Sequence, residues 1–166
     1  MLESWVLEVD GRKFEARVEM DSCMGEPWKE DDGHGDVSEW TRRDKAPGER
    51  VLCEDRGSKR YYDFAGAVKR ARSEGWNAAP YYPPGGETEG QRAQKAALAD
   101  FNRLKDYCAG DWYYVGIMVA PVCTCCGEAD GNKAESLWGV ESDAGDYLKE
   151  CAKELAHQIE PESVAA

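Results

Sequence analysis

Three cysteines close together in the sequence are the first residues with recognisable chemistry. Cys123, Cys125 and Cys126 form a C-x-C-C run, and cysteine thiolates are strong zinc ligands. A structural zinc site takes about four ligands, usually from two separated pairs, because one short stretch does not surround a tetrahedral ion. The candidates for a fourth ligand are Cys23, His34, Cys53 and His157. We therefore interpret the run as free thiols, with a metal site as the weaker alternative, and we expect no cofactor.

An acidic, glycine-rich segment between two tryptophans is the second candidate site. Its composition does not suit a core strand or helix, and exposed indoles are frequent anchors of protein interfaces. A calcium site is the weaker interpretation, because Val37 stands where an EF-hand loop needs glycine. No recognisable nucleophile accompanies the histidine of this segment, so we expect no enzyme. The predicted partner-binding residues are Trp28, Glu30, Asp31, Asp32, His34, Asp36 and Trp40.

A basic segment with interleaved aromatic residues follows directly. Arginines beside stacking aromatic side chains are typical of single-strand nucleic-acid-binding grooves. The chain as a whole, however, carries a formal net charge of −12, which repels phosphate. Nucleic-acid binding is therefore the alternative function, with Arg42, Arg43, Arg50, Arg56 and Arg60 as its predicted residues.

The negative charge is concentrated at the two ends of the chain. Residues 1–36 hold 11 acidic and 4 basic residues, and residues 127–166 hold 10 acidic and 3 basic residues. This distribution favours solubility and a basic protein partner. The first ten residues carry acids where a secretion signal would carry lysines, and no apolar run reaches the ~18 residues of a membrane span. We expect a cytosolic protein that does not contact membranes.

Hydrophobic periodicity predicts the elements that position these residues. Residues 5–9 and 13–20 flank Asp10-Gly11, and residues 13–20 alternate polar and apolar side chains, which is typical of a β-hairpin with a type I′ turn. Residues 50–54 and 59–62 form a second predicted hairpin, and residues 112–120 and 136–140 a third strand pair. Three helices are predicted, with N-caps at Asp63, at Thr88, and at Ser142 or Asp143.

This order of elements predicts the α+β class, an antiparallel sheet built from β-hairpins with about three helices packed on one face. The length suits a single domain over residues 1–160. Residues 20–49 form a long loop within it, and residues 161–166 are expected to be a flexible C-terminal tail.

Several long strings resemble a family of small uncharacterised proteins encoded by bacteriophages and prophages. They are PWKEDDGHGDVSEWTRRDKAPGERVLCEDRGSKRYYDF, DFNRLKDYCAGDWYYVGIMV and ESLWGVESDAGDYL, and the resemblance spans about Leu7 to Ile159. It implies expression in the cytoplasm of an infected bacterium. The family carries no activity that transfers to this chain. From the acidic charge and this context we expect an interaction protein that inhibits a host defence system, in the manner of an anti-CRISPR protein, with the acidic segment covering a basic protein surface. The alternative is an accessory of phage DNA metabolism that binds nucleic acid or a replication protein through Arg42 to Arg60.

Overall fold

The structure, a computed structural model, describes residues 1–76 and 85–160. Within it the chain divides into two compact units: unit 1 comprises Met1–Met24 and Trp112–Ala166, and unit 2 comprises Gly25–Asp111. Each unit has its own buried hydrophobic cluster. The sequence predicts one domain over residues 1–160, whereas the contacts separate two units. The predicted tail, residues 161–166, lies outside the described residues.

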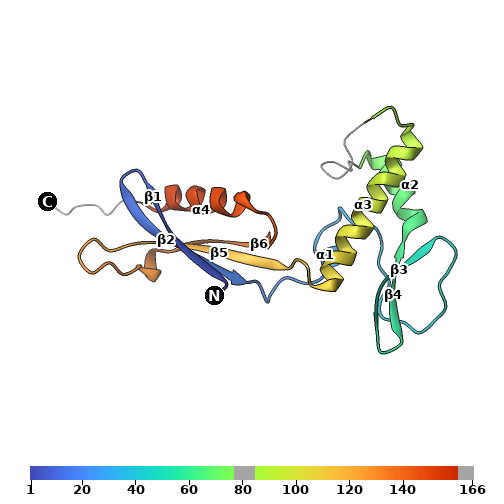
Figure 1. The fold of residues 1–166 in the computed structure, drawn as a ribbon, viewed down its shortest axis with the longest axis horizontal. Helices are drawn as coiled ribbons and strands as arrows, with labels where there is room; N and C mark the ends of the chain where they lie inside the picture. Colours follow the sequence, from blue (N-terminus) through green and yellow to red (C-terminus); the bar gives the residue numbers. More distant parts are fainter. Residues whose placement is uncertain (77–84, 161–166) are drawn as a thin grey trace. The chain divides into compact units, whose positions relative to one another are not determined.

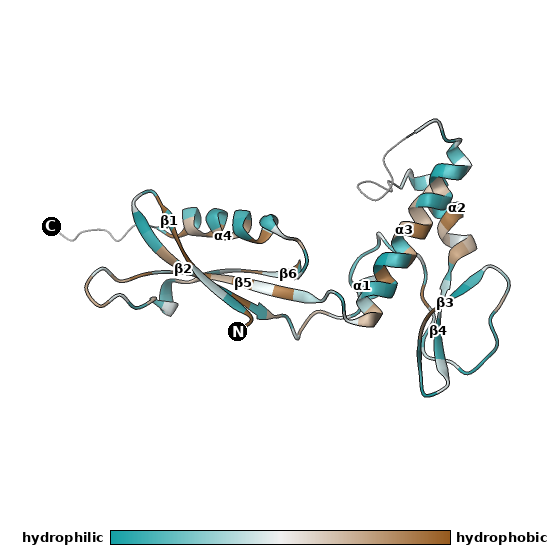
Figure 2. Ribbon diagram, viewed as in Figure 1, coloured by the Kyte–Doolittle hydropathy of each residue, from teal (hydrophilic) through white to brown (hydrophobic). Residues whose placement is uncertain are grey.

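Unit 1 is a four-stranded antiparallel sheet with one helix on it. Its strands are β1 (Glu3–Val9), β2 (Arg12–Met20), β5 (Tyr114–Pro121) and β6 (Glu135–Glu141), in the spatial order β1-β2-β5-β6. A short 3-10 helix, η1 (Gly131–Lys133), precedes β6. The helix α4 (Asp146–Gln158) lies along one face of the sheet (Figure 1). Hydrophilic and hydrophobic residues both occur along α4 (Figure 2), as packing on a sheet requires.

Alternation along the strands decides which side chains face α4. Phe14, Ala16 and Val18 of β2 belong to one buried cluster with Cys151 and Leu155 of α4. Because successive strand residues point to opposite faces, the residues between them lie on the face away from α4. We call this second side of the sheet the open face.

Local signals in unit 1 were predicted well at one turn and poorly at one helix start. Asp10 and Gly11 both have positive φ, 51° and 74°, as a type I′ turn requires, so this prediction is confirmed. The predicted N-cap at Ser142 or Asp143 is wrong, because α4 begins at Asp146 after Gly145. The Ser142 hydroxyl instead accepts a hydrogen bond from the Tyr113 backbone N–H at 3.0 Å.

Unit 2 combines one hairpin with two long helices and one short helix. Its elements are α1 (Pro27–Glu30), β3 (Glu49–Asp55), β4 (Ser58–Asp63), α2 (Phe64–Glu74) and α3 (Glu89–Ala109). Strands β3 and β4 form a separate two-stranded antiparallel sheet. The predicted caps are confirmed: the Asp63 carboxylate accepts from the Gly66 N–H, and Thr88 and Gln91 form a capping box.

The predicted loop over residues 20–49 begins in unit 1 and is held to unit 2 from Gly25 onward. It contains the short helix α1, and isolated antiparallel bridges join Val37 to Tyr62 and Thr41 to Lys59 of β4. The aromatic ring of Tyr62 is completely buried beneath this segment. The acidic segment is therefore attached to a folded scaffold.

The α+β class with antiparallel pairing is confirmed, although the strands form two sheets rather than one. In the second hairpin β3 pairs with β4, and β4 also forms bridges to the preceding loop. In the other sheet β2 pairs with β5, which is about 100 residues away in the sequence. Among the described helices, none combines the length and the apolarity needed to cross a membrane.

Candidate functional site

The acidic segment folds back onto its own unit. The Arg70 guanidinium of α2 donates hydrogen bonds to the backbone carbonyls of Asp32 and His34, at 2.8 Å and 2.9 Å. The same guanidinium lies 3.7 Å from the Asp36 carboxylate. One arginine thus fixes the course of the segment and offsets part of its charge.

Asp100 of α3 fixes the segment from a second side. Its carboxylate lies 2.5 Å from Nδ1 of His34 and accepts hydrogen bonds from the Gly35 N–H at 2.8 Å and the Tyr62 hydroxyl at 2.6 Å. The Asp100 side chain is only 10% exposed. Burial, and then the neighbouring Asp100 charge, raise the pKa of Tyr62, so its hydroxyl remains a donor. His34 is therefore a structural member of this network, and its ring is turned inward.

The two tryptophans that bracket the segment hold an arginine between them. The Arg60 guanidinium carbon lies 5.1 Å from the Trp28 ring centroid and 5.0 Å from that of Trp40. Arg60 is 5% exposed and forms an ion pair of 2.5 Å with Glu26. Burial raises the pKa of Glu26, but hydrogen bonds from Lys29 and Arg60 outweigh this effect and hold the pKa below its ordinary value.

The structure brings most of the predicted partner-binding residues together, although not as a free acidic arm. Five of the seven line a depression of about 390 Å³ beside Arg70 and Glu74. Trp40 lies outside it and is 45% exposed, and Glu30 also lies outside it, with its carboxylate bound to the Gly25 N–H at 3.1 Å. The residues lining the depression are Trp28, Asp31, Asp32, His34, Gly35, Asp36, Arg70 and Glu74.

The geometry around Arg60 gives a testable prediction about stability. Arg60→Lys keeps the charge but loses the planar fork and its stacking on Trp28 and Trp40. We expect the free energy of unfolding to fall by about 1–2 kcal/mol, the scale of desolvated cation–π contacts and charged hydrogen bonds. Denaturant unfolding measures this difference. Arg56→Lys is the matched control, because the Arg56 side chain is 93% exposed and lies at the turn of the same hairpin. Equal stability of the two variants would contradict the prediction.

Three of the five arginines predicted for nucleic-acid binding are engaged within unit 2. Arg43 makes two hydrogen bonds to the Glu49 carboxylate at 2.7 Å and 2.6 Å. The Arg50 guanidinium stacks 3.8 Å from the Phe64 ring centroid, and Arg60 is buried as described above. Arg42 and Arg56 are exposed. The arrangement offers phosphate fewer arginines than the sequence suggests.

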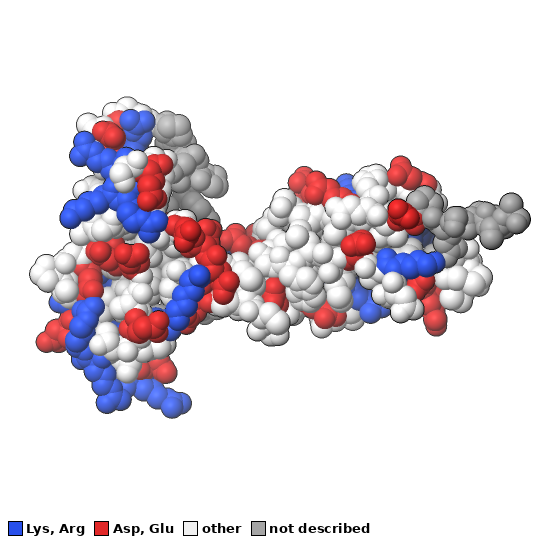
Figure 3. Space-filling model, turned by 180° about the vertical axis from the view of Figure 1, so that it is seen from behind, with Lys and Arg blue, Asp and Glu red and all other residues white. Residues whose placement is uncertain are grey.

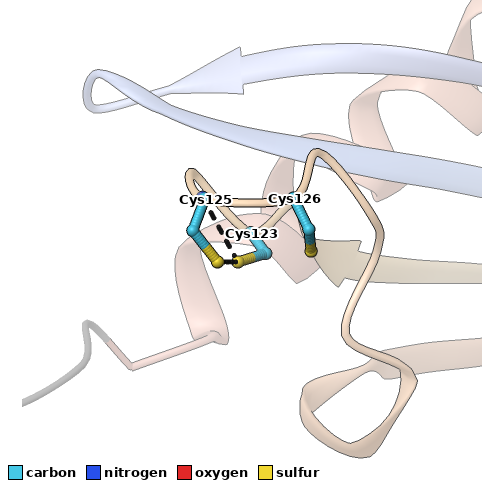
Figure 4. Close-up of side chains that lie close together, drawn as sticks. All are labelled: Cys123, Cys125 and Cys126. Carbon is cyan, nitrogen blue, oxygen red and sulfur yellow. Dashed lines mark hydrogen bonds between the residues drawn. The ribbon is translucent and has the colours of Figure 1, made fainter.

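The cysteine run lies in a tight loop at the end of β5. An antiparallel bridge between Val122 and Ala129 closes the loop, and the Gly127 N–H donates to the Cys123 carbonyl at 2.9 Å. The three sulfur atoms lie within 4.8 Å of one another, with 2.7 Å between Cys123 and Cys125. Figure 4 shows all three side chains pointing to the same side of the loop.

The loop also favours a thiolate at Cys123. Hydrogen bonds from the Cys125 thiol, and then from the backbone N–H groups of Cys126 and Cys125, lower the pKa of Cys123 to about 7. The Cys125 N–H lies 3.4 Å from Sγ of Cys123. At neutral pH about half of the Cys123 side chains therefore carry a negative charge.

The other cysteines provide a contrast that alkylation can measure. Cys151 is buried, and Cys53 and Cys108 are half-buried. Burial, and then a hydrogen bond to Cys53, raise the pKa of Cys108 to about 12. At pH 7 we expect iodoacetamide to modify Cys123 first and to leave Cys108 unmodified until denaturant is added. Peptide mass spectrometry measures the order, and modification of Cys108 as fast as exposed Cys23 in the native protein would contradict it.

The most uneven distribution of charge lies in unit 1, outside the acidic segment that the sequence analysis singled out. Unit 1 holds 16 acidic and 6 basic residues, whereas unit 2 holds 17 and 15. Figure 3 shows acidic and basic side chains interleaved on unit 2, and few basic ones on the visible face of unit 1. Pairing of β2 with β5 brings residues 1–24, with six of the acids of the N-terminal end, into one unit with the acidic C-terminal end.

The edge strand β6 carries exposed apolar side chains within this acidic unit. Leu137 is 38% exposed and Trp138 is 45% exposed. The Trp138 indole covers Gly116 of β5 on the open face: a Cβ added at Gly116 would lie 2.1 Å from a ring carbon of Trp138. The ring can lie this close to the backbone of β5 because Gly116 has no side chain. Glu135 and Glu141 stand at the two ends of β6.

Comparison with known proteins adds no assignment. The chain matches no protein-family model, and searches among curated proteins and among solved structures found no similar protein. The resemblance to phage-encoded proteins stays a prediction.

Proposed function

We propose that the chain is an acidic protein-binding module whose unit 1 binds a basic surface of another protein. The observation that carries this proposal is the excess of acidic over basic residues in unit 1, which gives it a formal charge of −10 against −2 for unit 2. A charge of this size attracts a basic partner and accelerates its association. The acidic segment of unit 2 is a weaker candidate, because Arg70 and Asp100 already bind it.

The surface around β6 supplies the contacts that charge alone does not. β6 ends the strand order of its sheet, so it is an edge strand. Edge strands present backbone groups to which another chain can add. Trp138 offers a large aromatic side chain of the kind that dominates binding energy at interfaces. Acidic residues at both ends of β6 suit a partner with basic residues around an apolar pocket.

The resemblance to phage-encoded proteins supplies the biological context of the proposal. A phage protein that covers a basic nucleic-acid-binding groove would inhibit a host defence component without catalysis, as an anti-CRISPR protein does. Complementary charge and a few buried anchors are sufficient for such inhibition. The partner in this proposal is therefore a bacterial defence protein with a basic surface, bound in the host cytoplasm.

Two single charge reversals test which unit binds. The variants are Glu135→Lys in unit 1 and Asp32→Lys in unit 2, and each replaces an exposed carboxylate with a cation. The tagged wild-type chain and the two tagged variants are each used to capture proteins from a bacterial lysate. We expect wild type and Asp32→Lys to retain a basic protein that Glu135→Lys captures several-fold less, and we expect capture to weaken with added salt. The captured protein is then identified and its affinity measured with the purified components.

The outcomes separate the surfaces. Loss of capture in Asp32→Lys with retention in Glu135→Lys would place the interface on the acidic segment and reject unit 1. Capture that does not change with salt would reject the electrostatic basis. A functional assay follows the same variants: phage plating on a host that carries the captured defence protein should rise with wild type and less with Glu135→Lys.

A further inference from the structure

The loop from Cys123 to Gly127 is a tight turn in which backbone N–H groups bond to Cys123, at its Sγ atom and at its carbonyl oxygen. Cys123 and Cys126 stand at the C-x2-C spacing that is common among zinc ligands. The Cys125 backbone N–H donates a hydrogen bond to Sγ of Cys123 at 3.4 Å and so orients this sulfur within the turn. Gly127, with φ of 77°, reverses the chain directly after the second of these cysteines. Cys125 adds a third sulfur to the same side (Figure 4).

The sulfur positions fit the dimensions of a metal centre. With a metal–sulfur distance of about 2.3 Å, two ligands of one ion lie about 3.8 Å apart in tetrahedral geometry. The three sulfurs all lie within 4.8 Å of one another. Cys123 and Cys125 would have to separate from their present 2.7 Å by about an ångström, which is a small rotation for side chains at the surface of a loop.

From this arrangement we propose that Cys123, Cys125 and Cys126 form a three-thiolate site for a thiophilic metal ion, either Zn²⁺ or Cu⁺. Soft thiolate ligands select these ions over Mg²⁺ or Ca²⁺, which prefer oxygen. The bridge between Val122 and Ala129 fixes the ends of the loop before the ion arrives, so little ordering is needed on binding. The charge of unit 1 also favours a cation.

The site leaves room for one more ligand. Within the part of the chain that the structure describes, no fourth histidine, cysteine or carboxylate joins this cluster. Three protein ligands with an open fourth position are typical of zinc that binds water or an external ligand, whereas closed structural sites use four. Cu⁺ would need no fourth ligand in a trigonal arrangement. The inference is independent of the proposed protein partner.

Competition titrations test the site on the full chain. The protein is produced without a histidine tag, reduced, stripped with a chelator and kept free of oxygen. Zn²⁺ is then titrated against a chromophoric zinc chelator, and Cu⁺ against bicinchoninate. We expect one equivalent of at least one ion to bind per chain, with a thiolate-to-metal absorption band in the near ultraviolet for Cu⁺. Binding of Zn²⁺ alone supports the water-completed site, and binding of Cu⁺ alone supports the trigonal site.

Serine variants assign the ligands. Changes that affect only outer hydrogen bonds of metal sites commonly cost about 10- to 100-fold in affinity. Cys123→Ser, Cys125→Ser and Cys126→Ser should therefore each weaken binding by at least about tenfold, and the triple variant should abolish it. Cys23→Ser is the matched control, because Cys23 is an exposed cysteine of the same unit outside the cluster.

Protection from alkylation identifies the metal ligands without an affinity measurement. The bound ion should protect Cys123, Cys125 and Cys126 from alkylation, as read by mass spectrometry, and leave Cys23 reactive. Unchanged circular dichroism and thermal unfolding of the serine variants would establish that they fold. The proposal is overturned if neither ion binds wild type more tightly than the triple variant, or if Cys23→Ser weakens binding as much as the cluster variants do.

Discussion

Replacing Asp100 with alanine is expected to lower the free energy of unfolding by about 3–5 kcal/mol. This is the largest effect on stability that we expect from a single substitution in the hydrogen-bond network of Asp100, Gly35 and Tyr62. The substitution leaves the buried Gly35 N–H without its acceptor and leaves the buried Tyr62 hydroxyl only its longer hydrogen bond, 3.4 Å, to the Ala97 carbonyl. Each unpaired buried donor costs about 1–3 kcal/mol, and bonds to a charged acceptor lie at the upper end. Denaturant unfolding followed by tryptophan fluorescence measures the loss.

The control for this prediction comes from the same helix. Asp106→Ala removes an exposed carboxylate of α3 and should change stability by no more than about 0.5 kcal/mol. Gly35→Ala tests the same network from the other side, since its added Cβ would lie 2.5 Å from the Tyr62 hydroxyl oxygen. We expect faster amide exchange over residues 31–36 in both Asp100→Ala and Gly35→Ala. A loss below about 1 kcal/mol in Asp100→Ala would show that water replaces the carboxylate without cost.

Replacing Trp138 with alanine is expected to weaken binding of the captured basic partner by about 30-fold or more. This is the effect of a hot-spot residue, whose truncation costs at least about 2 kcal/mol. The fold should tolerate the change, because the indole is 45% exposed and the β5 residue beneath it is a glycine. Calorimetric titration with the purified partner measures the affinity at two salt concentrations.

Two further variants distinguish a contact role of Trp138 from a general effect of aromatic residues. Tyr147→Ala removes another exposed aromatic side chain of unit 1, on α4, and should leave affinity unchanged. Gly116→Ala keeps the indole but displaces it from the sheet, because the methyl group would overlap the ring. We expect Gly116→Ala to weaken binding in the same direction as Trp138→Ala. Wild-type affinity in Trp138→Ala would remove β6 from the proposed interface.

Local chemistry made much of the fold predictable from the sequence. The Asp10-Gly11 turn, the Asp63 cap and the capping box that begins at Thr88 each depend on residues within four positions of one another. Their steric and hydrogen-bonding preferences act before any tertiary contact forms. The same holds for the alternation in β2, which decided its buried face. The start of α4 was wrong because Ser142, a good cap by type, is bound to the distant Tyr113.

The sequence by itself thus determined the α+β elements, the acidic character of the chain ends and the three neighbouring thiols. Only the tertiary structure decided that the acidic segment binds its own Arg70 and Asp100. It alone buried Arg60 between two indoles and joined residues 1–24 to the acidic C-terminal end in unit 1. These arrangements depend on residues 20 or more positions apart. Periodicity and capping carry no information on such pairings, because their energies come from burial and charge pairing that exist only once the chain has folded.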